Sequence, residues 1–314
     1  MNGHATVGRR RRISAAFCVA LCLGLHGPRL FAGDPTDADL QRMRREKRVA
    51  LVIGNGDYRN FPRLDNPLND ARGVAAALGG AGFEVILKLD ATRPQMLAAL
   101  EAFRQALARA DVGLFYFAGH AAQVDWRNYM VPVAAQLDAD RDPEALVGQV
   151  AQEAVDLDAV FTLMREADKR LNIVVLDACR DNPFVTKAQA VSRSLSRGTG
   201  REPFVVGTGL ARSSAPSRTF LAYATAPDQV ASDGAGRNSP FSGALIAALK
   251  VPDLKLEETF KNVRNAVASA TQQAQIPYDE SSVFDDFYFH IPASATRARA
   301  QAQQSGPNTT IIAP

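Results

Sequence analysis

The stretch Leu171–Arg180 constrains the fold of this chain more than any other segment. It reads Leu-Asn-Ile-Val-Val-Leu-Asp-Ala-Cys-Arg, with three β-branched residues in a row. A short, continuously apolar run of this kind is typical of a strand buried on both faces of a parallel sheet. Cys179 is therefore expected just past the carboxyl end of a central strand, where open α/β sheets place their ligand sites. A structural cysteine, buried only for packing, is the alternative interpretation.

Strand and helix patterns alternate along the rest of the chain. Further strands are predicted at 48–53, 83–89, 112–118, 218–224 and 287–289, of which 48–53 and 112–118 are expected to be buried. Helices are predicted at 69–78, 92–107, 157–167, 240–249 and 256–270, the last helix but one capped by Asn238. Residues 34–46 predict a linker, either loose or a short helical lead-in, and 139–153 predict a charged surface segment. The alternation predicts an α/β fold in three layers, with a mostly parallel central sheet of about six strands and helices on both faces.

The N-terminus has the pattern of an export signal. A basic run, Arg9–Arg12, precedes the apolar run Ile13–Leu25, and Leu30-Phe31-Ala32 ahead of Gly33 offers a small-residue cleavage site. The apolar run is too short to span a bilayer comfortably. We therefore predict a signal peptide over 1–33 and an exported chain, periplasmic or secreted, without a membrane span; a retained anchor is the alternative.

Length and composition predict one large domain over residues 47–291, made of a large part (47–184), a loop (185–217) and a small part (218–291). The 314 residues are 46% hydrophobic, which is enough for a sizeable core. The tail, 292–314, is rich in Gln, Ala, Ser and Thr and is expected to be disordered. A net charge of +3 without a basic stripe predicts no nucleic-acid partner.

Cys179 is the only cysteine outside the predicted signal peptide, which contains Cys18 and Cys22. An exported chain with one cysteine has no disulfide framework, so the thiol is a candidate for chemistry. His120 follows the strand pattern at 112–118, and if that strand neighbours the Cys179 strand, an imidazole can activate the thiol. A histidine satisfied at the surface is the alternative. One Cys with His120 and His290 is too small a set for a structural zinc site, so no metal is predicted.

The sequence Gly54-Asn55-Gly56-Asp57 follows the first predicted strand and has the Gly-x-Gly spacing of nucleotide-binding loops. No third glycine opens a helix at the required spacing, however. A plain turn from strand to loop is the preferred interpretation.

Two motifs resemble those of the caspase-like cysteine peptidases, specifically the bacterial metacaspase-like members. They are Tyr-Phe-Ala-Gly-His, ending at His120, and Asp-Ala-Cys-Arg around Cys179, 59 residues apart. Asn-Asp-Ala at 69–71, Asn-Pro-Phe at 182–184, Ala-Thr-Ala-Pro at 224–227 and Asn-Ser-Pro-Phe at 238–241 match as well. The resemblance covers about Lys47 to Phe289.

The resemblance implies a cysteine endopeptidase with His120 as base and Cys179 as nucleophile. The backbone N–H groups of Ala121 and Cys179 would hold the oxyanion. Cleavage after Arg or Lys would be set by Asp70 and Asp177, because a carboxylate pair matches a guanidinium. Helix capping by Asp70 and a strand-end turn at Asp177 are the structural alternatives. Gln229 and Ser232 match the segment that lines the substrate cleft.

Two positions depart from the family pattern: Ala121 and Asp228 stand where the family usually has glycine. The polar loop 187–202 contains Arg193, Arg197 and Arg201, which are candidates for self-cleavage.

Protein or peptide substrates with a basic residue before the cut are the expected partners. No cofactor is predicted; some relatives require calcium, which the sequence does not reveal. A caspase-like pseudoenzyme that binds proteins is the main alternative function, and hydrolysis of a non-protein substrate is a third.

Overall fold

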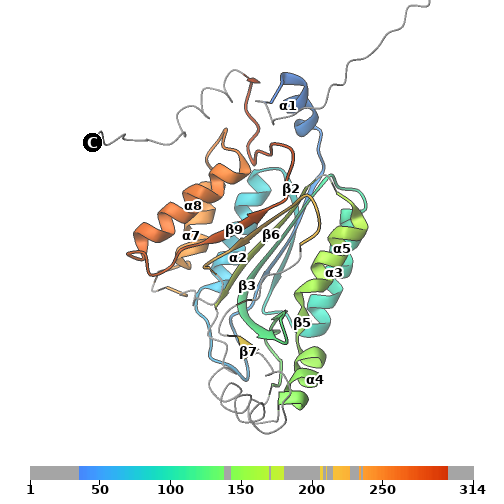
Figure 1. Cartoon of the computed structure of the whole chain (residues 1–314), viewed down its shortest axis with the longest axis vertical. Helices are drawn as coiled ribbons and strands as arrows, with labels where there is room; N and C mark the ends of the chain where they lie inside the picture. The colour runs from blue at the N-terminus through green and yellow to red at the C-terminus, as the bar shows by residue number, and fades with distance from the viewer. Residues whose placement is uncertain are drawn as a thin grey trace, which may run out of the picture. The chain divides into compact units, whose positions relative to one another are not determined.

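The computed structural model describes residues 35–137, 143–169, 171–179, 206–207, 210, 215–226, 233–234 and 236–295 (Figure 1). For Cys179 the description covers the backbone. The predicted signal peptide, the loop 187–202 and the tail beyond residue 295 lie outside these ranges.

A six-stranded sheet with the order β2-β1-β3-β6-β8-β9 forms the centre of the fold. The first five strands are parallel to their neighbours, and β9 runs antiparallel to β8 at one edge. Their bounds are β1 (Arg48–Gly54), β2 (Phe83–Leu89), β3 (Val112–Val124), β6 (Leu171–Cys179), β8 (Thr219–Tyr223) and β9 (Tyr278–Ser281). The prediction of a mostly parallel sheet of about six strands is confirmed.

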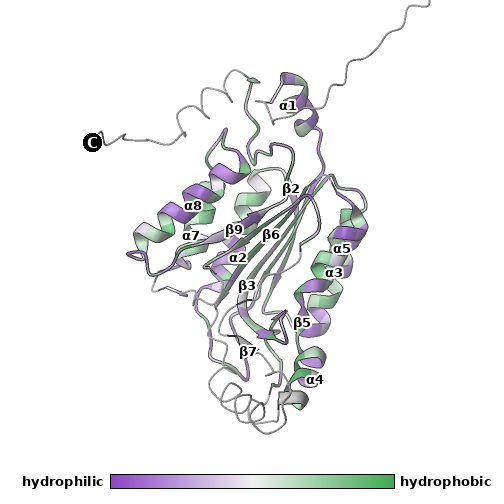
Figure 2. Cartoon of the chain, viewed as in Figure 1, coloured by the Kyte–Doolittle hydropathy of each residue, from purple (hydrophilic) through white to green (hydrophobic). Residues whose placement is uncertain are grey.

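Helices cover both faces of this sheet (Figure 1). The helices α2 (Pro67–Gly80), α7 (Pro240–Ala248) and α8 (Leu256–Ala270) pack on one face, and α3 (Arg93–Leu107) and α5 (Leu157–Ala167) on the other. Alternate residues of the strands pack on opposite faces of the sheet: in β1, Ala50 and Val52 belong to the hydrophobic cluster under α2, α7 and α8. Val49, Leu51 and Ile53 belong to the cluster under α3 and α5. Figure 2 shows hydrophobic and hydrophilic residues together on each of α3, α5 and α8, as amphipathic helices require.

The last strand lies at β9 and not at 287–289, so that prediction was wrong. Phe287, Tyr288 and Phe289 are fully buried, but their only bridge joins Tyr288 to Lys255. Phe287 and Phe289 belong to the hydrophobic cluster between the sheet and α2, α7 and α8. Tyr288 packs instead against Leu40 and Met43. Three consecutive aromatic residues have the apolar character of a strand, which is why 287–289 was predicted as one. The actual edge strand, β9, is polar because much of it faces solvent.

The bounds of several helices agree with their predicted ranges. Helix α3 begins after Thr92, whose backbone N–H donates to Gln95 Oε1 across 2.9 Å, and α5 and α8 match their predicted ranges. Helix α2 begins earlier than expected, at Pro67. Helix α7 is capped by Ser239 and not by Asn238: the Ser239 hydroxyl accepts the N–H of Ser242 at 2.9 Å. The predicted surface segment 139–153 contains a helix, α4 (Pro143–Glu153).

Strand β3 continues beyond the predicted end at residue 118 and builds a second, smaller sheet. Its last residues pair antiparallel with β4 (Arg127–Met130) and with β7 (Val206–Gly207), and β4 pairs with β5 (Val155–Asp156). A two-residue turn, Asp125-Trp126, joins β3 to β4, and both residues have positive φ. Such turns match the twist of a hairpin. His120 therefore lies within a continuous strand, where the two sheets meet.

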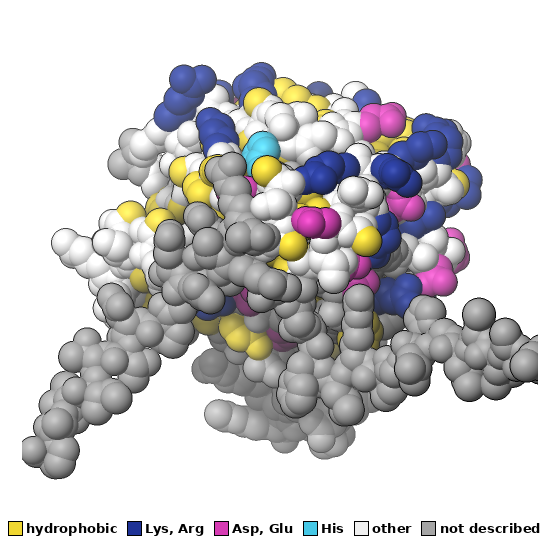
Figure 3. All heavy atoms as spheres, turned by 90° about the horizontal axis from the view of Figure 1, so that it is seen from above, with side chains coloured by type: hydrophobic (Ala, Val, Ile, Leu, Met, Phe, Trp, Pro, Cys, Tyr) yellow, Lys and Arg dark blue, Asp and Glu magenta, His cyan; other side chains and the backbone are white. Residues whose placement is uncertain are grey.

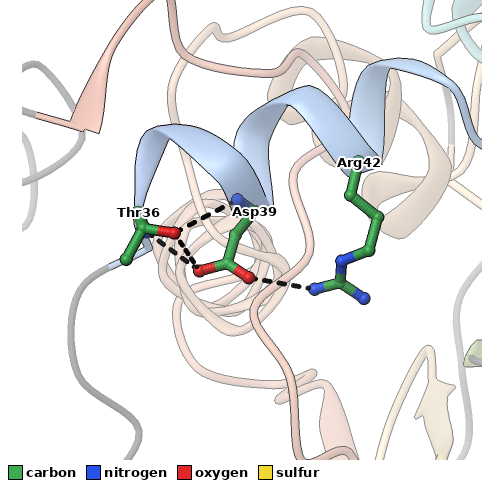
Figure 4. A network of polar contacts seen from close by, with 3 residues as sticks. All are labelled: Thr36, Asp39 and Arg42. Carbon is green, nitrogen blue, oxygen red and sulfur yellow. Dashed lines mark hydrogen bonds and ion pairs between the residues drawn. The ribbon is translucent and has the colours of Figure 1, made fainter. Parts of the chain in front are cut away.

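The region 34–46 adopts the helical alternative, as α1 (Asp37–Arg44). Figure 4 shows its capping box, in which Thr36 and Asp39 bond each other's backbone and side chain, and Arg42 pairs with Asp39. Leu40 and Met43 pack against Tyr288, so this helix belongs to the body of the fold.

Residues 292–295, the start of the predicted tail, contact α1. Arg44 donates to the carbonyl oxygen of Ala293 at 3.0 Å, and Asp37 accepts the N–H of Ala295 at 2.8 Å. Figure 3 views the end of the protein at which α1 lies in Figure 1, and shows Lys and Arg side chains with Asp and Glu among them. Among the described residues, no helix combines the length and the apolar character needed to cross a membrane.

Candidate active site

The backbones of His120 and Cys179 are direct partners in the central sheet. They form the last pair in the parallel register of β3 and β6, following Ala118–Asp177 and Gly119–Ala178. The condition on which the His120–Cys179 hypothesis depended, that these two strands are neighbours, is met. Two residues capable of nucleophilic chemistry are thereby placed on adjacent strands at the carboxyl end of the sheet.

The His120 ring has a defined orientation. Its Nε2 atom lies 2.8 Å from the carbonyl oxygen of Pro62, and the side chain is buried. Because a carbonyl only accepts hydrogen bonds, Nε2 carries the proton and Nδ1 retains a lone pair in the neutral ring. The rings of Tyr58 and Phe61 lie 4.5 and 6.3 Å from the imidazole, between centroids. His120 is thus held as the tautomer in which Nδ1 can accept a proton.

The N–H group of Ala121 is directed away from β4. Val131 donates its N–H to His120 O at 3.0 Å, so His120 belongs to a hydrogen-bonded position of the β3–β4 ladder. The next position, where Ala121 faces Met130, is then a non-bonded pair, whose N–H groups point to the other side of the strand. For Ala121 that is the side on which β6 ends at Cys179.

The unusual backbone conformation at this point belongs to Gly119, with φ of 151°, and not to Ala121. A Cβ atom on Gly119 would lie 2.5 Å from the Tyr58 hydroxyl oxygen and 3.0 Å from the carbonyl oxygen of Asn55. Glycine is therefore required both for the dihedral angle and for the close approach. Alanine at position 121 lies in extended strand and needs no such conformation.

Asp70 and Asp177 come together around Ser239. The backbone N–H of Ser239 donates to Asp70 Oδ1 at 3.1 Å, and its hydroxyl donates to Asp177 Oδ2 at 2.5 Å. Asn238 adds a side-chain bond of 2.7 Å to Asp70. Since the partners of Asp70 lie outside its own helix, capping of α2 does not account for this residue. The structure therefore brings both predicted pocket carboxylates to the amino end of α7.

A chain of hydroxyl groups continues from Asp177 into the core. Ser242 donates to Asp177 Oδ2 at 2.5 Å, and its oxygen lies 2.6 Å from the hydroxyl of Tyr116. Both serines and Tyr116 are buried. The Asp177 carboxylate is fixed by two hydroxyl donors, rather than by a turn at the strand end.

Burial raises the pKa of Asp70 and Asp177, because removal from water disfavours the charged form. For Asp70 the negative charge of Asp177 raises the pKa further, while the bonds from Asn238 and Ser239 oppose the shift. The hydroxyl donors Ser239 and Ser242 oppose it at Asp177. The described residues thus contain two buried carboxyl groups that share hydrogen bonds with neutral donors.

Asp233 is a third carboxylate at this site, and our sequence interpretation missed it. It raises the pKa of both Asp70 and Asp177, while its own pKa is raised by burial and lowered by hydrogen bonds from the backbone N–H groups of Asp65 and Asn66. The N–H of Asp65 donates to its Oδ2 at 2.9 Å, and the Asn66 side chain donates to its carbonyl oxygen. Its sequence signal is its position, directly after the predicted cleft segment that ends at Ser232.

The remaining predicted site residues fall outside the description. These are Gln229 and Ser232 of the cleft segment and the self-cleavage candidates Arg193, Arg197 and Arg201. Within the described ranges, no group of three or more His, Cys, Asp or Glu side chains is arranged to hold a metal ion.

The Gly-x-Gly segment after β1 forms a loop held by neighbouring side chains. Asp90 Oδ1 accepts the N–H groups of Gly56 and Asp57, each at 2.9 Å. Asn55 bonds the carbonyl oxygen of Val131 at 3.1 Å and accepts the N–H of Ala91 at 2.8 Å. The loop's own N–H groups are thus used within the protein, which supports the structural interpretation over phosphate binding.

Comparison with known proteins agrees with this architecture. A family model described as the caspase domain matches residues 47–288. The human protein named mucosa-associated lymphoid tissue lymphoma translocation protein 1 is 35% identical over 133 residues, which cover 42% of this chain and 15% of that protein. Its mouse homolog is 34% identical over the same length and the same shares. The chain thus matches only a small part of these curated relatives. Because the family model matches well over half of its residues, the chain belongs to the caspase-domain peptidase family.

Proposed function

We propose that this protein is an exported cysteine endopeptidase that cleaves peptide bonds after arginine or lysine. The observation that carries the proposal is the pairing of His120 with Cys179, two residues beyond Asp177 in β6. Asp177 is joined through Ser239 to Asp70. A base, a nucleophile and an acidic pocket therefore share one end of the sheet.

In the proposed reaction, His120 Nδ1 takes the proton of the Cys179 thiol, and the thiolate attacks the scissile carbonyl carbon. The N–H groups of Ala121 and Cys179 stabilise the oxyanion that forms. Collapse of the intermediate breaks the C–N bond, and the imidazolium donates its proton to the leaving amine. A water molecule activated by His120 then hydrolyses the thioester and restores the thiol. The bond from Nε2 to Pro62 keeps the basic nitrogen defined throughout.

The preference for a basic side chain rests on the carboxyls of Asp70, Asp177 and Asp233. Their hydrogen-bond donors are neutral, so no positively charged donor favours the ionised form of these carboxyls. A guanidinium or ammonium group entering beside them would supply that charge and lower their pKa values. An acidic substrate side chain would meet repulsion instead. The pocket therefore selects substrates by charge.

Two parts of the proposal rest on the sequence. Export rests on the N-terminal pattern of basic and apolar residues over 1–33. Self-processing rests on the arginines of the loop 187–202, which an enzyme of this specificity would meet at high local concentration.

Turnover of fluorogenic peptides tests the proposal. The purified protein should hydrolyse peptides that end in Arg or Lys before the fluorophore, and matched peptides that end in Asp or Gln much more slowly. Cys179→Ala should abolish turnover, while Gln105→Ala, on the exposed face of α3 in the same half of the domain, should retain it. A wild-type protein that binds basic peptides without cleaving them would instead identify a pseudoenzyme.

A further inference from the structure

The β3–β4 ladder is opened at His120 by a side chain from another loop. His120 occupies a hydrogen-bonded position, where its N–H would ordinarily meet the carbonyl oxygen of Val131. Instead the His120 N–H donates to the Tyr58 hydroxyl at 2.8 Å, and that hydroxyl donates to Val131 O at 3.3 Å. Tyr58 thus inserts its oxygen into the ladder beside the proposed base.

The Tyr58 ring also contacts the imidazole itself. The two ring centroids lie 4.5 Å apart with planes tilted by 51°, and Phe61 packs edge-on against Tyr58 at 6.2 Å. Tyr58 is buried, and its backbone N–H donates to Gly56 O at 3.0 Å within the loop that follows β1. One side chain therefore constrains both the peptide group and the ring of His120.

We propose that Tyr58 is a positioning residue for His120, and that its inserted hydroxyl sets the direction of Nδ1 and of the Ala121 N–H. The proposal rests on the proposed peptidase function. The Tyr58 hydroxyl fixes the amide on the N-terminal side of His120, and the bond from Val131 N fixes the carbonyl on its other side. That carbonyl shares a peptide plane with the Ala121 N–H, so both catalytic groups are fixed together.

The loop that carries Tyr58 is itself well anchored. Asp90 holds two of its N–H groups, and Asn55 bonds to the same carbonyl oxygen of Val131 that Tyr58 uses. The same loop supplies the Pro62 carbonyl to Nε2. This loop, which contains the Gly-x-Gly sequence, thus contacts His120 at its backbone N–H, at its ring and at Nε2.

Removing only the hydroxyl isolates the proposed role. Tyr58→Phe keeps the ring contact but deprives the His120 N–H of its acceptor. We expect kcat to fall at least about tenfold, because displacements near 1 Å at a catalytic group cost up to about 100-fold, while KM changes little. Tyr288→Phe is the matched control, since this tyrosine is also buried but packs against Leu40 and Met43 of α1. It should leave kcat unchanged.

A second readout does not require peptide turnover. Alkylation of Cys179 by iodoacetamide, quantified by mass spectrometry of its peptide across a pH series, reports how well His120 activates the thiol. In Tyr58→Phe the rate near neutral pH should fall, and its midpoint should move to higher pH. Thermal unfolding of both tyrosine variants shows whether they are folded. Gly119→Ala, whose Cβ would displace the Tyr58 oxygen, should reproduce the alkylation change.

If Tyr58→Phe turned over peptides and were alkylated at Cys179 at the same rates as the wild-type protein, the proposal would be overturned. Equal losses of kcat in Tyr58→Phe and Tyr288→Phe would also overturn it, because they would indicate a general effect on stability. If the wild-type protein cleaves no peptide but its Cys179 alkylation still depends on Tyr58, the peptidase assignment fails and the positioning role stands.

Discussion

The Ser239 hydroxyl lies 2.5 Å from the Asp177 carboxylate, although the two residues belong to different layers of the fold. Ser239 caps α7 and Asp177 belongs to the central strand β6. The same serine reaches Asp70 through its backbone N–H. Helix initiation and assembly of the acidic pocket therefore depend on one residue.

Ser239→Ala should consequently affect both stability and activity. Loss of a helix cap costs about 0.5–2 kcal/mol of unfolding free energy. Loss of the hydroxyl donor to Asp177 should in addition lower kcat/KM for Arg substrates. Thr36→Ala, which removes the cap of α1, should destabilise the protein without this change in kcat/KM. Denaturant unfolding and steady-state kinetics of the two variants provide the measurement. If Ser239→Ala and Thr36→Ala had equal kcat/KM values for Arg substrates, Ser239 would have no role in the pocket.

Asp70→Asn should weaken the preference for basic substrates. The substitution keeps the size of the side chain but leaves a group that cannot ionise beside a bound guanidinium, and loss of a buried charged contact costs about 2–5 kcal/mol. We expect kcat/KM for Arg peptides to fall accordingly, whereas the slow turnover of Gln peptides should change little. Asp158→Asn is the control, because this carboxylate is exposed and pairs with Arg127. An unchanged ratio of Arg to Gln turnover in Asp70→Asn would contradict the pocket assignment.

The acidic cluster should make the folded state less stable as pH rises. Asp70 has its pKa raised to about 8, so the folded state binds more protons than the unfolded state above the ordinary Asp value of about 3.9. Stability then falls with rising pH through that window. Asp70→Asn removes this contribution, so it should gain stability relative to the wild type between pH 5 and pH 8, about the span of the window. Urea unfolding at several pH values tests this; parallel pH profiles would show that Asp70 titrates normally.

Self-cleavage should occur after Arg193, Arg197 or Arg201. The proposed specificity for arginine and the small, polar residues in the sequence around these positions favour cleavage in this segment. Mass spectrometry of the purified wild-type protein should show two fragments that elute together. Cys179→Ala, handled identically, should stay intact; the same cut in that variant would indicate a contaminating protease.

The sequence predicted those parts of the fold whose patterns are local. Helix α8 shows its amphipathic face, and β6 its continuous apolar run, so both were predicted within a residue or two. The extension of β3 through Val124 was missed because Gly119 resembles a strand end. Strand β9 was missed because its residues are polar at a sheet edge. In both cases the pairing is set by tertiary contacts.

The candidate site shows the same division. His120, Cys179, Asp70 and Asp177 were singled out through their motifs, and the structure brings their elements together. Tyr58 and Asp233 lie in loops without periodic patterns, and their importance depends on which distant residues they meet. Ser239 belongs to the Asn-Ser-Pro-Phe motif at 238–241, but only the fold reveals that it bonds to two carboxylates.

The most direct test of the central claim is covalent labelling with peptidyl halomethyl ketones. An inhibitor that ends in Arg presents an electrophile to the nucleophile while its side chain occupies the acidic pocket. We predict a single adduct on Cys179, formed much faster than with the matched Asp inhibitor, and lost in His120→Ala. Labelling of Cys179 at equal rates by both inhibitors, or undiminished labelling in His120→Ala, would contradict the account.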